Sequence, residues 1–145
     1  MYANFSMEVS MRTFLIFTVL LLFSFQVFGA AAFAQAIDKD GNAITWTFSF
    51  IEGKNVGAAK NGAVKQLKSQ GHGKVKAAKG TTLNRGYFAV LYTAYWVKGV
   101  LKKSYAFGFS SKSEEGAKAD ALKEIKKLKG WKEDQGYSVN KSGEF

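Results

Sequence analysis

The sequence predicts an α+β domain in which one small antiparallel sheet of three to five strands carries two amphipathic helices on one face. Three observations support this fold class. Apolar residues alternate with a period of two in several segments, they recur every three or four residues in two others, and glycine-containing turns separate these segments. The 145 residues include no cysteine and no proline, so packing must stabilise the domain and Gly, Asn and Asp must make its turns.

Residues 1–36 are predicted to be a secretory signal peptide. Residues 14–25 form a continuous apolar block, and the small residues that follow offer A-x-A cleavage sites ending at Ala34 and Ala36. The basic residue that such a signal needs just before its apolar block comes directly after Met11, which is therefore the expected start of translation.

This leader predicts that residues 37–145 fold as a single exported domain, which is periplasmic or secreted after cleavage. The length suits one ordinary domain. The alternative is an N-terminal membrane anchor, because residues 14–34 supply about the 20 apolar residues that a membrane span needs.

The first predicted strand and helix follow each other in residues 44–70. In residues 44–50 large apolar residues alternate with Thr and Ser, which predicts a half-buried strand. Its core-facing residues are Ile44, Trp46, Phe48 and Phe50. From residue 55 the apolar spacing changes to three and four, which predicts a helix over residues 55–70 that ends at Gly71.

The middle of the chain predicts a hairpin. Residues 71–85 are rich in Gly and Lys and contain only a weak edge strand at residues 74–77. Residues 87–97 are almost continuously apolar, as in a strand covered on both faces. A tight turn at Lys98-Gly99 then leads into the alternating strand of residues 100–109.

The last helix has the clearest start signal. Residues 111–114, Ser-Lys-Ser-Glu, match a capping box, and Gly130 follows the final turn. The apolar stripe of this helix consists of Ala117, Ala121, Leu122, Ile125 and Leu128. Tyr137 and Val139 predict a short terminal strand.

Two strand–helix pairs resemble each other weakly. Residues 48–50 (FSF) precede residues 63–68 (AVKQLK), and residues 107–109 (FGF) precede residues 121–126 (ALKEIK). One interpretation is a duplicated unit with two similar binding edges. The other is that any strand–helix pair with lysines looks this way, and we favour it because it requires no duplication.

The predicted order of elements over residues 55–129 resembles that of double-stranded RNA-binding domains. The segment GFSSKSEEGAKADAL is similar to the glycine-serine-lysine entry of their second helix, where lysines meet the phosphates. Here Ser113, Glu114 and Glu115 follow Lys112 where that family carries further lysines. The resemblance therefore implies an α+β arrangement of sheet and helices and does not extend to RNA binding.

Positive charge is concentrated in the middle of the chain. The chain has a net charge of +10, and between Glu52 and Glu114 twelve basic residues occur with no acidic one. Such a stretch favours anionic partners through long-range attraction and counterion release. For an exported protein these partners are an anionic envelope polymer, lipid head groups or extracellular nucleic acid. The predicted anion-binding residues are Lys65, Lys68, Lys98, Lys102 and Lys103.

The leading prediction is therefore a small exported, non-catalytic basic protein of the cell envelope or secreted fraction, which binds an anionic polymer or membrane surface. The alternative is a protein-interaction or structural envelope component with incidental charge, whose contact is an apolar patch or a strand edge. A lysine-rich surface that only maintains solubility would show the same composition. Trp96, beside the hairpin turn, is the aromatic residue expected to be exposed.

Enzymatic chemistry has few candidate residues. His72 is the only histidine and there is no cysteine, which excludes a histidine metal cluster, a Ser-His pair and a cysteine nucleophile. We expect no cofactor, no metal and no catalytic activity. A minor alternative is a hydrolase with paired carboxylates, for which Glu52, Glu114 and Glu115 are the candidates because they end or begin predicted elements.

Overall fold

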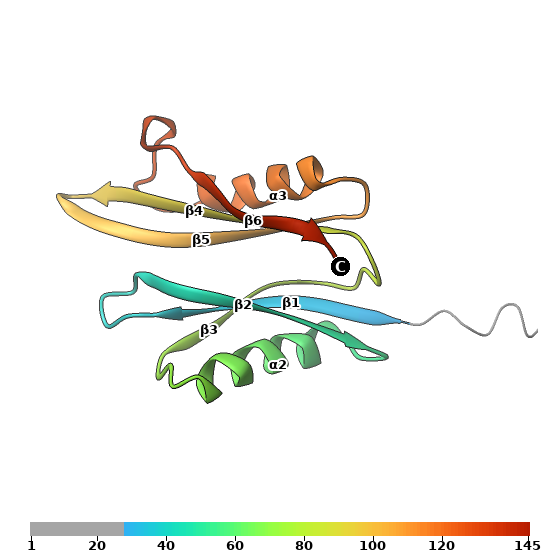
Figure 1. Ribbon diagram of the computed structural model, residues 1–145. Helices are drawn as coiled ribbons and strands as arrows, with labels where there is room; N and C mark the ends of the chain where they lie inside the picture. Colours follow the sequence, from blue (N-terminus) through green and yellow to red (C-terminus); the bar gives the residue numbers. More distant parts are fainter. Residues whose placement is uncertain (1–27) are drawn as a thin grey trace, which may run out of the picture.

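The computed structural model describes residues 28–145, which form four layers in the order helix, sheet, sheet, helix (Figure 1). The elements in chain order are β1 (Gly29–Ile37), β2 (Ala43–Glu52), α2 (Val56–Ser69), β3 (Val75–Thr81), β4 (Tyr87–Val97), β5 (Val100–Ser110), α3 (Glu114–Lys126), a 3-10 turn (Glu133–Gln135) and β6 (Ser138–Glu144). The apolar block at residues 14–25 and the start at Met11 lie outside the described residues, as does most of the alternative anchor at residues 14–34, whose last six residues belong to β1.

The predicted α+β class is confirmed, whereas the predicted single sheet with both helices on one face is not. Six strands form two three-stranded antiparallel sheets, in the orders β2-β1-β3 and β5-β4-β6. α2 covers the outer face of the first sheet and α3 the outer face of the second (Figure 1). A period of two indicates that a segment is a strand, but it does not indicate which strands pair.

Local signals fix the helix starts and the hairpin turn. Asn55 caps α2 by accepting a hydrogen bond from the backbone N of Ala58 at 2.9 Å. Ser113, and not Ser111, caps α3, because its Oγ accepts from the backbone N of Gly116 at 3.0 Å. In the β4–β5 turn both Lys98 (φ 51°) and Gly99 (φ 80°) have positive φ, as a two-residue turn between twisted strands requires.

β1 is the central strand of the first sheet, although it lies within the predicted leader. It pairs with β2 on one side and with β3 on the other. The side chains of residues 30–34 and Ala36 have no exposed surface. Residues 29–36, which the sequence analysis placed in the leader, therefore belong to the folded domain. The small residues that suggested a cleavage site have a packing role, because alanines in β1 let the alanines of α2 approach the sheet closely.

The main core lies between the two sheets and is built from phenylalanine. Phe33 of β1 stacks on Phe107 of β5 with ring centroids 4.6 Å apart, and Phe48 of β2 stacks on Phe88 of β4 at 5.4 Å. Val90 is buried in the same cluster. Aromatic contacts across the sandwich thus hold the two sheets together without a disulfide.

The two halves of the chain repeat one ββαβ unit. In each half a hairpin precedes a helix and a third strand, and the first strand of the hairpin is the central strand of the sheet. The same irregularity recurs as well. Pairing of β1 with β3 shifts register between Ala32 and Ala34, and pairing of β4 with β6 shifts between Val90 and Leu91. The structure favours duplication, which is the interpretation that we had not favoured from the sequence.

Equivalent positions in the two units follow from strand pairing and from the helix caps. Phe33 lies opposite Phe48 in the first hairpin, and Val90 lies opposite Phe107 in the second. Counted from the two N-caps, the buried residues of the helices occupy the same positions. These equivalent pairs are Ala59 and Ala117, Ala63 and Ala121, and Leu67 and Ile125.

Candidate functional site

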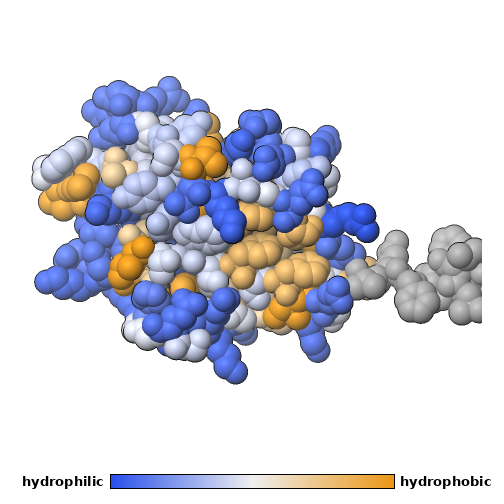
Figure 2. Space-filling view, viewed as in Figure 1, coloured by the Kyte–Doolittle hydropathy of each residue, from blue (hydrophilic) through white to orange (hydrophobic). Residues whose placement is uncertain are grey.

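The exposed face of α2 carries lysines and no acidic residue. Lys65 and Lys68 are exposed, whereas Ala63 and Leu67 pack against the sheet. α2 contains three lysines in all, and within residues 28–145 none of them takes part in an ion pair. In the space-filling view hydrophilic residues cover the two helical layers, and hydrophobic residues gather along the seam between the sheets (Figure 2).

α3 has lysines at the same positions but surrounds them with acids. Lys123 and Lys126 are equivalent to Lys65 and Lys68 when counted from the N-caps. α3 has three lysines and four acidic residues within its bounds, and Lys126 Nζ lies 3.1 Å from Glu133 Oε1. Two helices of matching shape therefore differ in charge, and only α2 is positive along its whole length.

The other three predicted lysines lie on the β4–β5 hairpin, in the second sheet. Lys102 Nζ donates to the backbone O of Asp40 at 3.1 Å, and the backbone N of Lys103 donates to Asn42 Oδ1 at 3.2 Å. Lys98 occupies the turn. The structure thus divides the five predicted lysines into two groups, one on α2 and one on the hairpin beside the β1–β2 turn (Figure 1).

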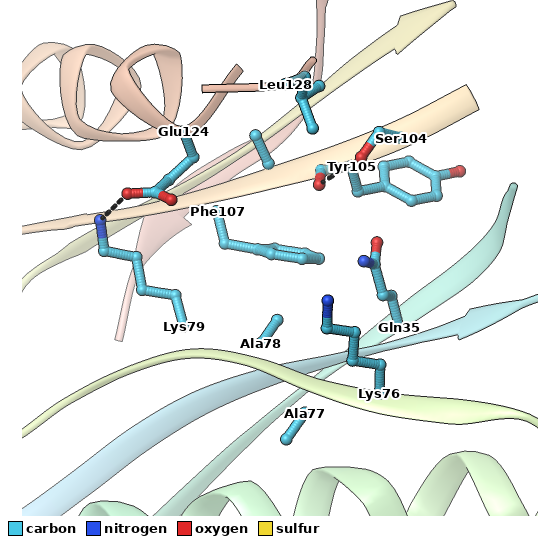
Figure 3. A pocket seen from close by; sticks show the side chains of 11 residues that line it. Gln35, Lys76, Ala77, Ala78, Lys79, Ser104, Tyr105, Phe107, Glu124 and Leu128 are labelled. Atoms are coloured by element: carbon cyan, nitrogen blue, oxygen red, sulfur yellow. Dashed lines mark hydrogen bonds and ion pairs between the residues drawn. The ribbon is translucent and has the colours of Figure 1, made fainter. Parts of the chain in front are cut away.

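A cleft of about 390 Å³ opens between β3 of the first sheet and β5 of the second. Phe107 and Ala78 form its apolar floor, and Leu128 and Glu124 lie at the end near α3 (Figure 3). Tyr105 contributes an aromatic wall. The cleft therefore lies between the two repeated units and takes residues from both.

Polar groups converge on this cleft from β1, β3 and β5. Gln35 Oε1 is buried and has no hydrogen-bond partner in the part of the chain that the structure describes. The ammonium of Lys76 points toward Gln35 from the neighbouring strand (Figure 3). Burial, and then the nearby Tyr92, raise the pKa of Tyr105, so its hydroxyl stays protonated at neutral pH and can donate a hydrogen bond.

The duplication creates an equivalent position between β2 and β6, and there a side-chain hydrogen bond closes the junction between the two sheets. Trp46 is equivalent to Tyr105, since each lies two residues before a core phenylalanine at matching register. Asn140 is equivalent to Ala78, since both lie at the register shift of the third strand. Trp46 Nε1 donates to Asn140 Oδ1 at 2.8 Å and bridges the two sheets.

Lys79 bridges the two units at the α3 end of the cleft. Its Nζ lies 2.8 Å from Asp120 Oδ2 and 3.5 Å from Glu124 Oε1. Burial raises the pKa of Asp120, but hydrogen bonds from Lys79 and the backbone N of Phe109, with the charges of Lys79 and Lys123, outweigh it and hold that pKa below its ordinary value. The hydrogen bond from Lys127 and the charge of Lys79 lower the pKa of Glu124 despite its burial. Both acids are therefore ionised at neutral pH and are poor proton donors.

We expect Asp120→Asn to lower the free energy of unfolding at neutral pH by about 1 kcal/mol, because the pair with Lys79 is partly solvent-exposed. Because folding lowers the pKa of Asp120, this carboxylate stabilises the folded state fully at pH values above its ordinary pKa. The stabilisation is lost as the pH falls through the lowered pKa of the folded state. The difference between wild type and variant should therefore shrink as the pH falls below about 4. Urea unfolding at neutral and acidic pH measures this, and a constant difference would contradict the assignment.

The carboxylates considered for a hydrolase lie elsewhere. Glu52 ends β2, while Glu114 and Glu115 open α3, and Glu115 Oε1 pairs with Lys118 Nζ at 2.7 Å. The acids that the structure does bring together are Asp120 and Glu124, which Lys79 engages. Residues 28–145 contain no group of three or more His, Cys, Asp or Glu arranged to hold a metal ion.

The end of the β4–β5 hairpin exposes apolar side chains. Trp96 is 58% exposed and pairs across the hairpin with Leu101, which is 39% exposed. Val100, in the next pair, is 53% exposed. These three residues form the hairpin tip, a small apolar surface beside Lys98.

The fold departs from the arrangement that the resemblance to RNA-binding domains implied. β3 belongs to the first sheet, whereas β4 and β5 belong to the second. α2 and α3 cover different sheets, so no single sheet carries both helices (Figure 1). No family model, curated protein or solved structure matches the chain at a significant level. Within the described residues, no helix is both long enough and apolar enough to cross a bilayer.

The cleft could not be predicted from the sequence for two reasons. Gln35 had been assigned to the leader, and Lys76, Ala78 and Tyr105 come from separate strands whose pairing the sequence does not give. The signal that points to the cleft is the internal repeat, because aligning FSF (residues 48–50) with FGF (residues 107–109) places Trp46 opposite Tyr105. The match of Asn140 to Ala78 needs the register shifts of the third strands as well.

Proposed function

We propose that this protein is a small exported, non-catalytic basic protein that binds an anionic polymer through the lysine face of α2. The observation that carries the proposal is the charge difference between the two equivalent helices. α2 has three lysines and no acid, whereas α3 has three lysines and four acids. A solubilising surface gives no reason for one copy of a duplicated helix to lack acids.

A polymer suits this surface better than a membrane does. Helices that bind at a bilayer surface insert large apolar side chains beside their basic ones. The large apolar residues that are exposed within the described chain include none from α2. They are Phe28, Ile44, Phe50, Trp96, Val100, Leu101, Tyr137 and Val139.

The predicted leader sets the proposed location and the class of polymer. Export places the domain among envelope polymers and extracellular nucleic acid, and the proposal is compatible with cleavage upstream of Gly29. The hairpin lysines form a second group on the other sheet, so α2 is the primary contact in this proposal.

We expect the double substitution of Lys65 and Lys68 by alanine to weaken binding to polyphosphate and to polygalacturonate. The slope of log affinity against log salt concentration should decrease in magnitude by about 1.5, because binding releases fewer counterions when two lysine contacts are missing. The matched control replaces Lys123 and Lys126 by alanine, which removes the same charge from the same helix positions. Its slope should change by less than half as much, because acids already neutralise those lysines.

Three results would overturn the proposal. The first is an absence of salt-dependent binding to either polymer at low ionic strength. The second is an equal loss in the two double variants. The third is tighter binding to phosphatidylglycerol vesicles than to either polymer, which would assign the surface to a membrane.

The hairpin tip supports a second candidate function, contact with a protein partner. Trp96, Val100 and Leu101 are exposed together, and exposed aromatic residues are common at interface hot spots. Substitution of Trp96 by serine would then abolish a salt-insensitive interaction while leaving polymer binding intact. Salt sensitivity of the contact separates the two candidates.

A further inference from the structure

We propose that the cleft between β3 and β5 binds a single sugar acid, meaning a monosaccharide unit that carries a carboxylate. This inference goes beyond the proposed function, because it concerns a different surface and a ligand of one unit. The two proposals can hold or fail independently.

The size and lining of the cleft suit a compact ligand. Its volume of about 390 Å³ lies within the range of small-molecule sites. Phe107, Ala78 and Leu128 give it an apolar lining, and Tyr105 adds a flat aromatic wall. A sugar ring presents flat C–H faces to such a wall and hydroxyl groups around its rim.

Two polar groups in the cleft lack a hydrogen-bond or ion-pair partner within the described residues. Gln35 Oε1 is buried without a donor among the described residues, and an unsatisfied buried acceptor destabilises the folded state. Lys76 Nζ points toward the Gln35 side chain and has no carboxylate partner within residues 28–145 (Figure 3). One ligand hydroxyl and one ligand carboxylate would satisfy both, and a sugar acid carries the two groups on neighbouring carbons.

Charges at the two ends of the cleft orient the ligand. Glu124 lies at the end near α3, where Lys79 and Lys127 hold it at 3.5 and 2.8 Å. The acids and lysines at that end pair with one another, whereas Lys76 at the other end has no carboxylate partner among the described residues and can attract a ligand carboxylate. The geometry therefore favours a ligand with one carboxylate and places that group at Lys76.

The equivalent junction in the other half of the molecule gives independent support for a binding role of the cleft. In the equivalent space between β2 and β6, Trp46 and Asn140 meet at 2.8 Å. The chain thus contains a closed form of the same junction, and the smaller Tyr105 and Ala78 leave the β3–β5 side open. Only the open side places an unsatisfied amide beside a lysine.

The test uses galacturonate, with galactose as the neutral probe, followed by amide chemical shifts in NMR. The test contains no polymer and uses a buffer of low ionic strength, which preserves the attraction between Lys76 and the carboxylate. The location of the shifts separates binding in the cleft from binding at α2, so failure of that proposal does not affect this one. We expect saturable shifts confined to β1, β3 and β5 with galacturonate. Lys76→Gln should weaken galacturonate about tenfold, the loss expected for one charge-assisted hydrogen bond, and should leave galactose unchanged.

The double variant Ala78→Asn/Tyr105→Trp copies the closed junction into the open side and should abolish binding. The matched control is Trp46→Tyr/Asn140→Ala, which alters the equivalent junction and should leave galacturonate binding intact. Shifts that are absent or unsaturated in wild type overturn the proposal, as does retained binding in the closed variant. Equal affinity for galactose and galacturonate overturns the role of Lys76, and this comparison holds even if the closed variant does not fold.

Discussion

A chain that begins at Ile37 will not fold, whereas one that begins at Phe28 will. The first lacks β1, whose backbone pairs with both β2 and β3. Without β1, these two strands lose their common neighbour and the ring of Phe33 leaves the core. The loss exceeds the 5–15 kcal/mol that typically stabilises a domain, because the sheet pairing and buried surface of eight of the nine β1 residues disappear together.

Urea unfolding followed by tryptophan fluorescence checks this expectation. The chain from Phe28 should show one cooperative transition, and the chain from Ile37 should show none. If the leader is removed in the cell, mass spectrometry of the mature protein should find an N-terminus at or before Gly29. A cooperative transition in the shorter chain, or a mature N-terminus at residue 35 or 37, would contradict the placement of β1.

Phe33→Ala should lower the free energy of unfolding by about 3–5 kcal/mol, the range for a large aromatic residue removed from a core. Phe33 has no exposed surface and contacts rings from both sheets, including Phe48 at 5.1 Å and Phe107 at 4.6 Å. Phe50 is the matched control, because it is 37% exposed at the edge of the same aromatic layer. Phe50→Ala should cost less than about 2 kcal/mol.

The duplication supplies a second test of the same core. Val90 occupies in the second unit the position that Phe33 occupies in the first, and both lie in one buried cluster. Phe33→Val/Val90→Phe keeps the total volume while exchanging the two residues, and volume-conserving exchanges are tolerated best. It should recover at least half of the stability that Phe33→Val loses. Strictly additive losses would show that the two positions do not share one space.

Several elements were predictable from local signals. α2 begins after its N-cap Asn55 and ends before Gly71, because side-chain capping and positive φ act within one helical turn. The Lys98-Gly99 turn fixed the β4–β5 hairpin for the same reason. The alternation from Ile44 to Phe50 gave β2, but of its four large apolar residues only Trp46 and Phe48 pack against the main core, whereas Ile44 and Phe50 at its ends are exposed.

Other features had no such local signal. β1 consists mostly of alanine. A run of small residues after an apolar block is also typical of a signal cleavage site, so the sequence favoured a domain without residues 29–36. The five lysines all come from the acid-free stretch but fall on different layers. The lack of acidic residues around the α2 lysines is recognised only by comparison with the equivalent helix α3.

The sequence by itself determined the α+β class, the two helices, the central hairpin and the excess positive charge, because these depend on periodicity, capping and composition within short segments. Only the tertiary structure decided that the strands form two sheets, that the halves are copies of one unit, and that Gln35, Lys76 and Tyr105 share a cleft. The physical reason is that strand pairing and sheet packing join residues far apart in the chain. Backbone hydrogen bonds and aromatic contacts select those partners, and neither produces a periodic pattern in the sequence.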